Sequence, residues 1–166
     1  MIKIRNQDIL HRLDFKHPAT WTATWLGCGL LQPAPGTWGT LGGLPFGIFL
    51  LMTGGIPALV AAAIICFFVG LWAAKHFERM VREKDSGMIV IDEVVGIWIA
   101  MIPAVLTPLS IGLAFILFRL FDVWKPWPIS YLDKKVHGAM GVMIDDVLAG
   151  IFAALVLIGL RHVGLG

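Results

Sequence analysis

Five carboxylates stand out because they interrupt segments that are otherwise apolar. They are Asp92, Glu93, Asp122, Asp145 and Asp146. A charge at bilayer depth costs at least about 2.5–3.5 kcal/mol, so acids inside such segments need partners. Acids gathered in one small volume repel one another unless they share protons or hold a cation. Because hard divalent cations such as Mg²⁺ prefer oxygen ligands, we interpret all five as candidate metal ligands and catalytic residues.

The same acids have a structural interpretation. They could form intramembrane ion pairs with cations that lie close in sequence, Arg119, Lys125 and Lys134. Neighbouring acids on a helix point about 100° apart, so one member of each pair would face a given metal. The other member would hold a second metal, a lysine or a helix N-terminus. Both interpretations stay open, and the metal site is preferred.

A small-residue segment precedes the first long apolar run. Small residues and hydroxyls directly before a helix leave backbone N–H groups free and let an anion approach closely. We therefore predict phosphate or substrate binding at Gly36, Thr37, Gly39 and Thr40. The alternative is an ordinary Pro-Gly turn in which a threonine caps the helix.

Three further residues are candidates for phosphate binding: Arg119, Lys125 and His137. Lys125 follows Asp122 by three residues, a spacing that puts both on one side of a helix end. An ammonium beside a metal would neutralise a phosphate during its transfer, which makes Lys125 a candidate catalytic residue as well. Alternatively, Lys125 extends to the membrane surface among its flanking tryptophans. A lone histidine such as His137 in a polar loop is usually only solvated.

The composition indicates that lipid surrounds the chain. Of its 166 residues, 58% are hydrophobic and only 14% are charged, whereas soluble proteins carry roughly 25% charged residues. So few charged residues cannot cover the hydrophobic core of a protein that is surrounded by water. The bilayer is therefore an expected partner. The formal net charge of +2 does not indicate nucleic-acid binding. Cys28 and Cys66 are expected to be buried, inert thiols.

The apolar segments predict an all-α, polytopic membrane bundle with about four to five membrane-embedded helices. The expected helices are residues 41–53, 57–74, 88–106, 109–121 and 141–160. Gly54 to Pro57 should break the first apolar run, and the short first helix would rise only about 20 Å. Residues 1–20 are expected to form an interfacial amphipathic or polar segment, followed by one membrane domain over 21–166. An interfacial loop is expected at 21–39, and polar loops are expected at 75–85 and after residue 122.

The positive charges predict one orientation in the membrane. Four lysines and arginines lie in the N-terminal segment, four at 75–84 and four at 119–135, whereas the other side holds only Arg161. The positive-inside rule therefore places the N-terminus and both polar loops in the cytoplasm. The five acids begin or end the predicted spans on that same side, so we expect them at a similar depth, just under the cytoplasmic surface.

Four motifs occur in order. They are Pro-Gly-Thr-x-Gly-Thr at 35–40, Ile-Val-Ile-Asp-Glu-Val-Val-Gly at 89–96, Phe-Arg-x-Phe-Asp-x-x-Lys-Pro-x-Pro-Ile at 118–129 and Gly-x-Met-Ile-Asp-Asp-x-x-Ala-Gly at 141–150. Together they resemble the phosphatidylglycerophosphatase A family of bacterial inner membranes, over about residues 22–155. The resemblance implies a mostly helical fold. It also implies Mg²⁺-dependent removal of the terminal phosphate from phosphatidylglycerophosphate, which gives phosphatidylglycerol.

The expected mechanism combines this resemblance with the residues. Asp92, Asp122, Asp145 and Asp146 are the favoured Mg²⁺ ligands, and Glu93 is the candidate for orienting or deprotonating the attacking water. Lys125 and the backbone amides around 36–40 would stabilise the phosphoryl oxygens. The alternatives are a phosphatase or transferase for another lipid phosphate, and a small cation-coupled transporter subunit. The number of metals, a phospho-enzyme step and the oligomeric state stay open.

Overall fold

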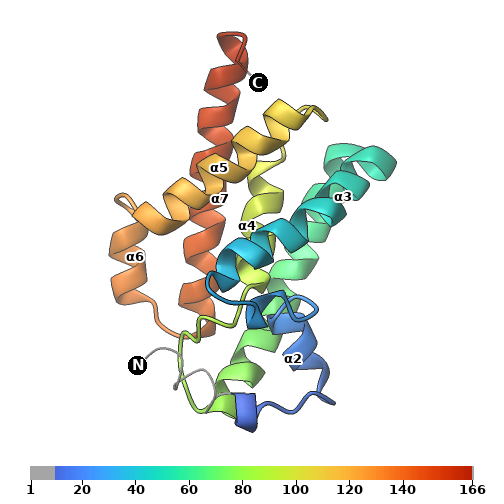
Figure 1. The fold of residues 1–166 in the computed structure, drawn as a ribbon. Coiled ribbons are helices and arrows are strands. Elements are labelled where there is room, and N and C mark those ends of the chain that lie inside the picture. The colour runs from blue at the N-terminus through green and yellow to red at the C-terminus, as the bar shows by residue number, and fades with distance from the viewer. Residues whose placement is uncertain (1–9, 166) are drawn as a thin grey trace.

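The computed structural model describes residues 10–165, and within that range the chain is helical with no strand. The helices are α2 (Pro18–Ala23), the 3₁₀ turn η1 (Cys28–Leu30), α3 (Pro35–Val81), α4 (Ile91–Ala100), α5 (Pro108–Trp124), α6 (Ile129–Lys135) and α7 (Ala139–His162). Figure 1 shows α4 between α3 and α7, with α5 crossing in front. The all-α prediction is confirmed.

Helix α3 is bent into two arms. Gly55 has non-helical angles (φ 63°, ψ −162°) two residues before Pro57, and beyond it the chain turns back toward its starting level (Figure 1). The break predicted at 54–57 is therefore confirmed. The helix starts six residues earlier than predicted because Pro35 occupies its first turn, a favoured position for proline. It also continues through the polar sequence to Val81, because Phe77 and Val81 are fully buried.

Helix α4 is the centre of the bundle and is much shorter than predicted, with ten residues instead of the span expected at 88–106. Three glycines spaced by four residues on the first arm of α3 allow it to pack closely on α4. A Cβ atom at Gly39 would lie 2.5 Å from Cβ of Val90. The next glycine, Gly43, accepts a hydrogen bond at its carbonyl from Trp98 Nε1, at 2.9 Å.

Close backbone contact also joins α4 to α7. A Cβ atom at Gly96 would lie 2.8 Å from the carbonyl oxygen of Asp146, and a Cβ at Gly150 would collide with the carbonyl of Gly96. Glycine at these two positions therefore lets the start of α7 approach the start of α4. This approach places the acids of the two helices side by side.

Two helices among the described residues, α3 and α7, are long and apolar enough to cross a membrane. They carry large apolar side chains that face outward, such as Phe49, Phe68 and Leu155. By contrast, α4 and α5 contain 10 and 17 residues, or about 15 and 25 Å of helix, against about 30 Å of hydrocarbon. The structure supports a helical membrane protein, and the predicted four to five membrane-embedded helices are not confirmed.

The segment before α3 packs on the bundle. Leu13 is buried, and Arg12 donates a hydrogen bond to the carbonyl of Val81 at 3.0 Å. Residues 1–9 of the interfacial segment expected at 1–20 lie outside the described residues. Helix α2 crosses residue 20, and the domain division expected there stays a prediction. The two cysteines are free, and Cys66 is buried.

Candidate functional site

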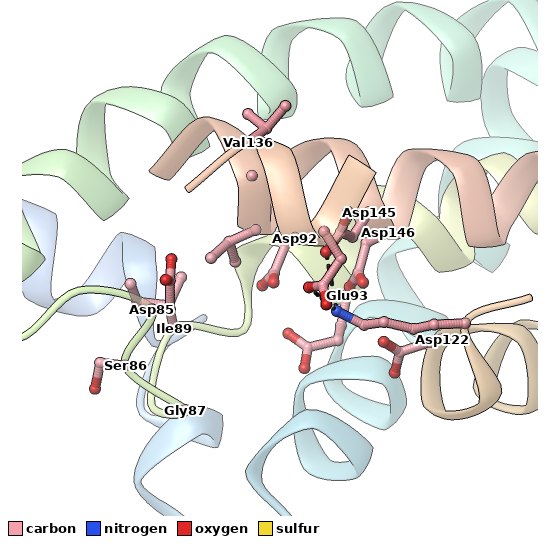
Figure 2. A pocket seen from close by; sticks show the side chains of 14 residues that line it. Asp85, Ser86, Gly87, Ile89, Asp92, Glu93, Asp122, Val136, Asp145 and Asp146 are labelled. Atoms are coloured by element: carbon pink, nitrogen blue, oxygen red, sulfur yellow. Dashed lines mark hydrogen bonds and ion pairs between the residues drawn. The ribbon is translucent and has the colours of Figure 1, made fainter. Parts of the chain in front are cut away.

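All five predicted acids line one cavity of about 250 Å³. Asp92 and Glu93 lie in the first turn of α4, where the positive end of the helix dipole favours acids. Asp122 comes from the last turns of α5, and Asp145 and Asp146 from the second turn of α7. Figure 2 shows the carboxylates of these three helices converging. We call this cavity the acidic pocket.

Three of the acids form a tight, buried cluster. One oxygen from each of Asp92, Glu93 and Asp146 lies within 4.8 Å of the other two. Asp92 and Asp146 are only 6% and 4% exposed. Each of the three side chains also has a buried oxygen without a hydrogen-bond partner: Asp92 Oδ1, Glu93 Oε2 and Asp146 Oδ2. Unpartnered buried carboxylates are costly unless a cation balances them, so this donor set could bind a metal ion.

The nearby cations pair mainly with the acids outside the cluster. Arg119 lies 2.6 Å from Asp122 and 4.0 Å from Glu93. Lys125 lies 2.9 Å from Asp145. Among the described residues, no ion pair reaches Asp92 or Asp146. The structural interpretation of the acids therefore accounts for Asp122 and Asp145 and leaves the centre of the cluster unbalanced.

Lys125 points into the acidic pocket. It terminates α5 in the left-handed conformation (φ 46°), and its Nζ donates to Asp133 Oδ1 at 2.6 Å and to Asp145 Oδ2 at 2.9 Å. Burial alone would lower the pKa of Lys125, but the hydrogen bonds to Asp133 and Asp145 outweigh it and raise the pKa. The hydrogen bond from Lys125 in turn lowers the pKa of Asp133. The ammonium is thus held charged and in place, which differs from the alternative in which Lys125 extends to the membrane surface.

Part of the small-residue segment supports Arg119 and Glu93. A Cβ at Gly36 would collide with Glu93 Oε1 and would lie 3.1 Å from Arg119 Nη1. The Thr40 hydroxyl donates to the carbonyl of Gly36 at 2.8 Å and accepts from Arg119 Nη1 at 3.5 Å. Thr37, half-buried, lies in the same first turns of α3. These contacts place the start of α3 beside the acids.

Two predicted site residues lie elsewhere. Gly39 packs against Val90, and His137 lines a separate pocket between α3 and α7. Their predicted roles in phosphate binding stay predictions. The contact with Val90 explains the glycine at position 39 by close helix packing alone.

Asp133 and Asp85 were not predicted from the sequence as site residues. Asp133 follows Lys125 by eight residues, and only the turn before α6 brings it back to that lysine. Asp85 lines the acidic pocket, and its Oδ1 accepts a hydrogen bond from the Gly138 amide at 3.0 Å. The turn residues Pro126 and Pro128 were the available signal for Asp133, because they predict that the chain reverses there.

Comparison with known proteins finds a matching family model and similar relatives. The model of the family described as "Phosphatidylglycerophosphatase A" matches residues 21–161. A phosphatidylglycerophosphatase A of Haemophilus influenzae is 38% identical over 92% of this chain and 94% of its own length. One of Escherichia coli K12 is 36% identical over 95% and 92%. A "putative phosphatidylinositol-3-phosphatase" of Bacteroides thetaiotaomicron is 36% identical over 84% and 91%.

No solved structure matches the chain. The matched region contains every residue that lines the acidic pocket, from Asp85 to Asp146. With a family model over most of its length and close relatives over nearly all of it, the chain belongs to the phosphatidylglycerophosphatase A family.

Proposed function

We propose that the protein is a phosphatase that hydrolyses the terminal phosphate of phosphatidylglycerophosphate to give phosphatidylglycerol and inorganic phosphate. The observation that carries this proposal is the buried cluster of Asp92, Glu93 and Asp146, in which, among the described residues, only Glu93 has a cation within ion-pair distance, Arg119 at 4.0 Å. Two relatives that cover nearly the whole chain bear the name of this activity. The outward-facing apolar side chains of α3 and α7 fit a substrate that is itself a membrane lipid.

The donor set fits Mg²⁺, the hard cation used with phosphate esters. Asp92, Glu93 and Asp146 would hold it, and Asp122 and Asp145 line the same pocket. A bound Mg²⁺ would neutralise charge on the phosphoryl oxygens and increase the acidity of a water molecule.

The residues of the chain contribute the remaining chemistry. Lys125, held by Asp133 and Asp145, would neutralise a phosphate oxygen at the mouth of the pocket. Arg119 would offer a second cationic contact from α5. Glu93, with the carboxylate oxygen that does not hold the cation, would orient the attacking water and accept its proton.

The two alternative functions, hydrolysis of another lipid phosphate and ion transport, have weaker support. The Bacteroides relative makes phosphatidylinositol 3-phosphate an alternative substrate, and both substrates end in a phosphomonoester. An ion-transport function is disfavoured because the cavity beside the far half of α4 is lined only by apolar side chains, including Val95, Ile99 and Val147. A path for ions would require polar groups there.

A phosphate-release assay on the purified full chain tests the proposal. The substrates are phosphatidylglycerophosphate, phosphatidic acid and phosphatidylinositol 3-phosphate, each in mixed micelles with Mg²⁺ or with EDTA. We expect phosphatidylglycerophosphate to be hydrolysed fastest and EDTA to stop the reaction. Faster phosphate release from phosphatidylinositol 3-phosphate would identify that lipid as the substrate instead. Undiminished release in EDTA would contradict the metal site.

The proposed location is the bacterial inner membrane, with the acidic pocket facing the cytoplasm. This orientation rests on the positive charges of the loops. Single cysteines at Glu83 and Lys134, in a background lacking Cys28 and Cys66, should react with a membrane-impermeant thiol reagent only after the cells are opened. Labelling of either position in intact cells would contradict the cytoplasmic site.

A further inference from the structure

A second pocket of about 510 Å³ lies beside the acidic pocket, between the second arm of α3 and the start of α7. One side of it is apolar and is formed by Leu71 and Trp72 of α3 and Met140 of α7. Trp72 and Met140 are 41% and 45% exposed, so these side chains face the surroundings of the protein. We call it the lysine pocket, after its other side.

The other side of the lysine pocket is cationic. Lys75, Lys84 and His137 line it, and all three side chains are exposed. Among the described residues, no ion pair or hydrogen bond occupies the amino group of Lys75 or Lys84. The pocket contains one acid, Glu78, whose Oε1 accepts a hydrogen bond from the Asp85 amide at 3.0 Å. The lysines are therefore free to bind an anion.

The position of the pocket matches the membrane surface. The apolar sequence of α3 ends at Ala74, and Lys75 begins the polar part of the helix. Apolar side chains thus lie on the membrane side and lysines on the water side, which is the order of acyl chain and headgroup in a phospholipid. The start of α7 adds the positive end of its helix dipole at Ala139.

We propose that the lysine pocket binds an anionic phospholipid, at a site distinct from the one where substrate is hydrolysed. The lipid phosphate contacts Lys75 and Lys84, and its acyl chains lie along Leu71, Trp72 and Met140. The two pockets are separated by the hydrogen bond from the Gly138 amide to Asp85, which lines the acidic pocket, whereas Gly138 lines the lysine pocket. This inference goes beyond the proposed phosphatase activity.

Native mass spectrometry of the full chain tests the proposal. The protein is equilibrated in detergent with equal amounts of dioleoyl-phosphatidylglycerol and dioleoyl-phosphatidylcholine, and the retained lipids are counted. We expect the wild-type chain to retain phosphatidylglycerol in preference. The double variant Lys75→Gln/Lys84→Gln should lower that preference at least about fivefold, the effect of one lysine near an anionic lipid.

A matched control removes the same charge elsewhere. Lys134→Gln/Lys135→Gln alters two exposed lysines of α6, outside the lysine pocket, and should keep the wild-type preference. An equal loss in this control, or no preference in the wild type, would overturn the proposal. Equal melting temperatures of the two double variants would show that both are folded.

Two further binding measurements identify the ligand and its site. Excess inorganic phosphate should leave phosphatidylglycerol bound, and its complete displacement would assign the pocket to a soluble anion instead. Asp92→Asn should keep lipid binding, because that residue lies in the acidic pocket. Loss of binding in Asp92→Asn would overturn the separate site. Since no arm measures turnover, the result is independent of the proposed phosphatase activity.

Discussion

The two sides of the acidic pocket balance their charge in different ways. On one side, Asp92, Glu93 and Asp146 are packed together deep between α4 and α7, with unpartnered oxygens. On the other side, Lys125 bridges Asp133 and Asp145 near the opening, and the Asp133 side chain is 44% exposed. Among the described residues, the first side has only the 4.0 Å contact of Arg119 with Glu93, whereas the second holds a lysine in direct contact with its acids.

This difference assigns different tasks to the two sides. The buried cluster is incomplete without a cation, because buried carboxylates close together repel one another. The lysine side has its own cation, and its two acids hold that ammonium in position. We therefore expect substitutions in the cluster to abolish metal dependence. Substitutions on the lysine side should slow turnover without changing metal binding.

The largest effect is expected for Asp92→Asn and Asp146→Asn, which keep shape and remove charge. Each should lower turnover by at least about 10²–10³-fold. Because binding to the folded state stabilises it, Mg²⁺ should raise the melting temperature of the wild type. That rise should disappear in both variants, whose stability without metal should equal or exceed that of the wild type. Near-normal turnover in both would refute the metal cluster.

Lys125→Ala should lower turnover about 10²-fold, the usual cost of losing one contact to a developing oxyanion. It should also lower the melting temperature, because it leaves the buried Asp145 unpaired. The double variant Lys125→Ala/Asp145→Asn is the control, which should recover stability but not turnover. Lys125→Arg should restore activity only in part, because a planar guanidinium does not replace a compact ammonium. Full activity in the double variant would show that Lys125 only pairs with Asp145 and does not contribute to turnover.

Gly36→Ala tests the contact that links α3 to the cluster. The added methyl would collide with Glu93 Oε1, so Glu93 must move, and we expect turnover to fall about 10- to 100-fold. Gly112→Ala of α5 is the matched control, because a Cβ there meets nothing within 4 Å. It should keep full activity and gain stability, since alanine favours helix. Equal activities of the two variants would show that the position of Glu93 is not critical.

The smallest effect is expected for Asp133→Asn, which weakens one of the two hydrogen bonds that position Lys125. Turnover should fall about tenfold, the lower limit for outer residues that orient a functional group. KM and the stabilisation by Mg²⁺ should stay unchanged. A change in Mg²⁺ stabilisation as large as that of Asp92→Asn would mean that the two sides of the pocket are not separate.

Much of the site could be predicted from residue types alone. Carboxylates such as Asp92 and Asp146 inside apolar segments are too costly to be incidental, and the position of each at the start of its helix indicated a common level. The bend of α3 was predictable because Gly54, Gly55 and Pro57 disrupt helix locally. Helix ends were less predictable. The extension of α3 to Val81 depends on burial of Phe77 and Val81 against other helices.

The partners of Lys125 were not predictable. Asp122 lies three residues from Lys125, a spacing that puts both on one side of the helix end, but the structure pairs Asp122 with Arg119 and Lys125 with Asp133 and Asp145. Sequence spacing describes neighbours on one helix, as it does for Arg119 and Asp122 of α5, whereas the contacts of Lys125 depend on how α5, α6 and α7 meet. The length of α4 was overestimated for a related reason. A run of hydrophobic residues indicates that a segment is buried, but it does not distinguish burial among other helices from burial in lipid.

The sequence by itself determined the membrane-like composition, the helical class and the set of acids, because these follow from residue types and local periodicity. Only the tertiary structure decided which acids form the buried cluster and which hold Lys125. It also decided that Gly96 and Gly150 serve the contact of α4 with α7. The physical reason is that the balance of charge in a pocket depends on distances of a few ångströms between separate helices, and residue order along the chain does not contain those distances.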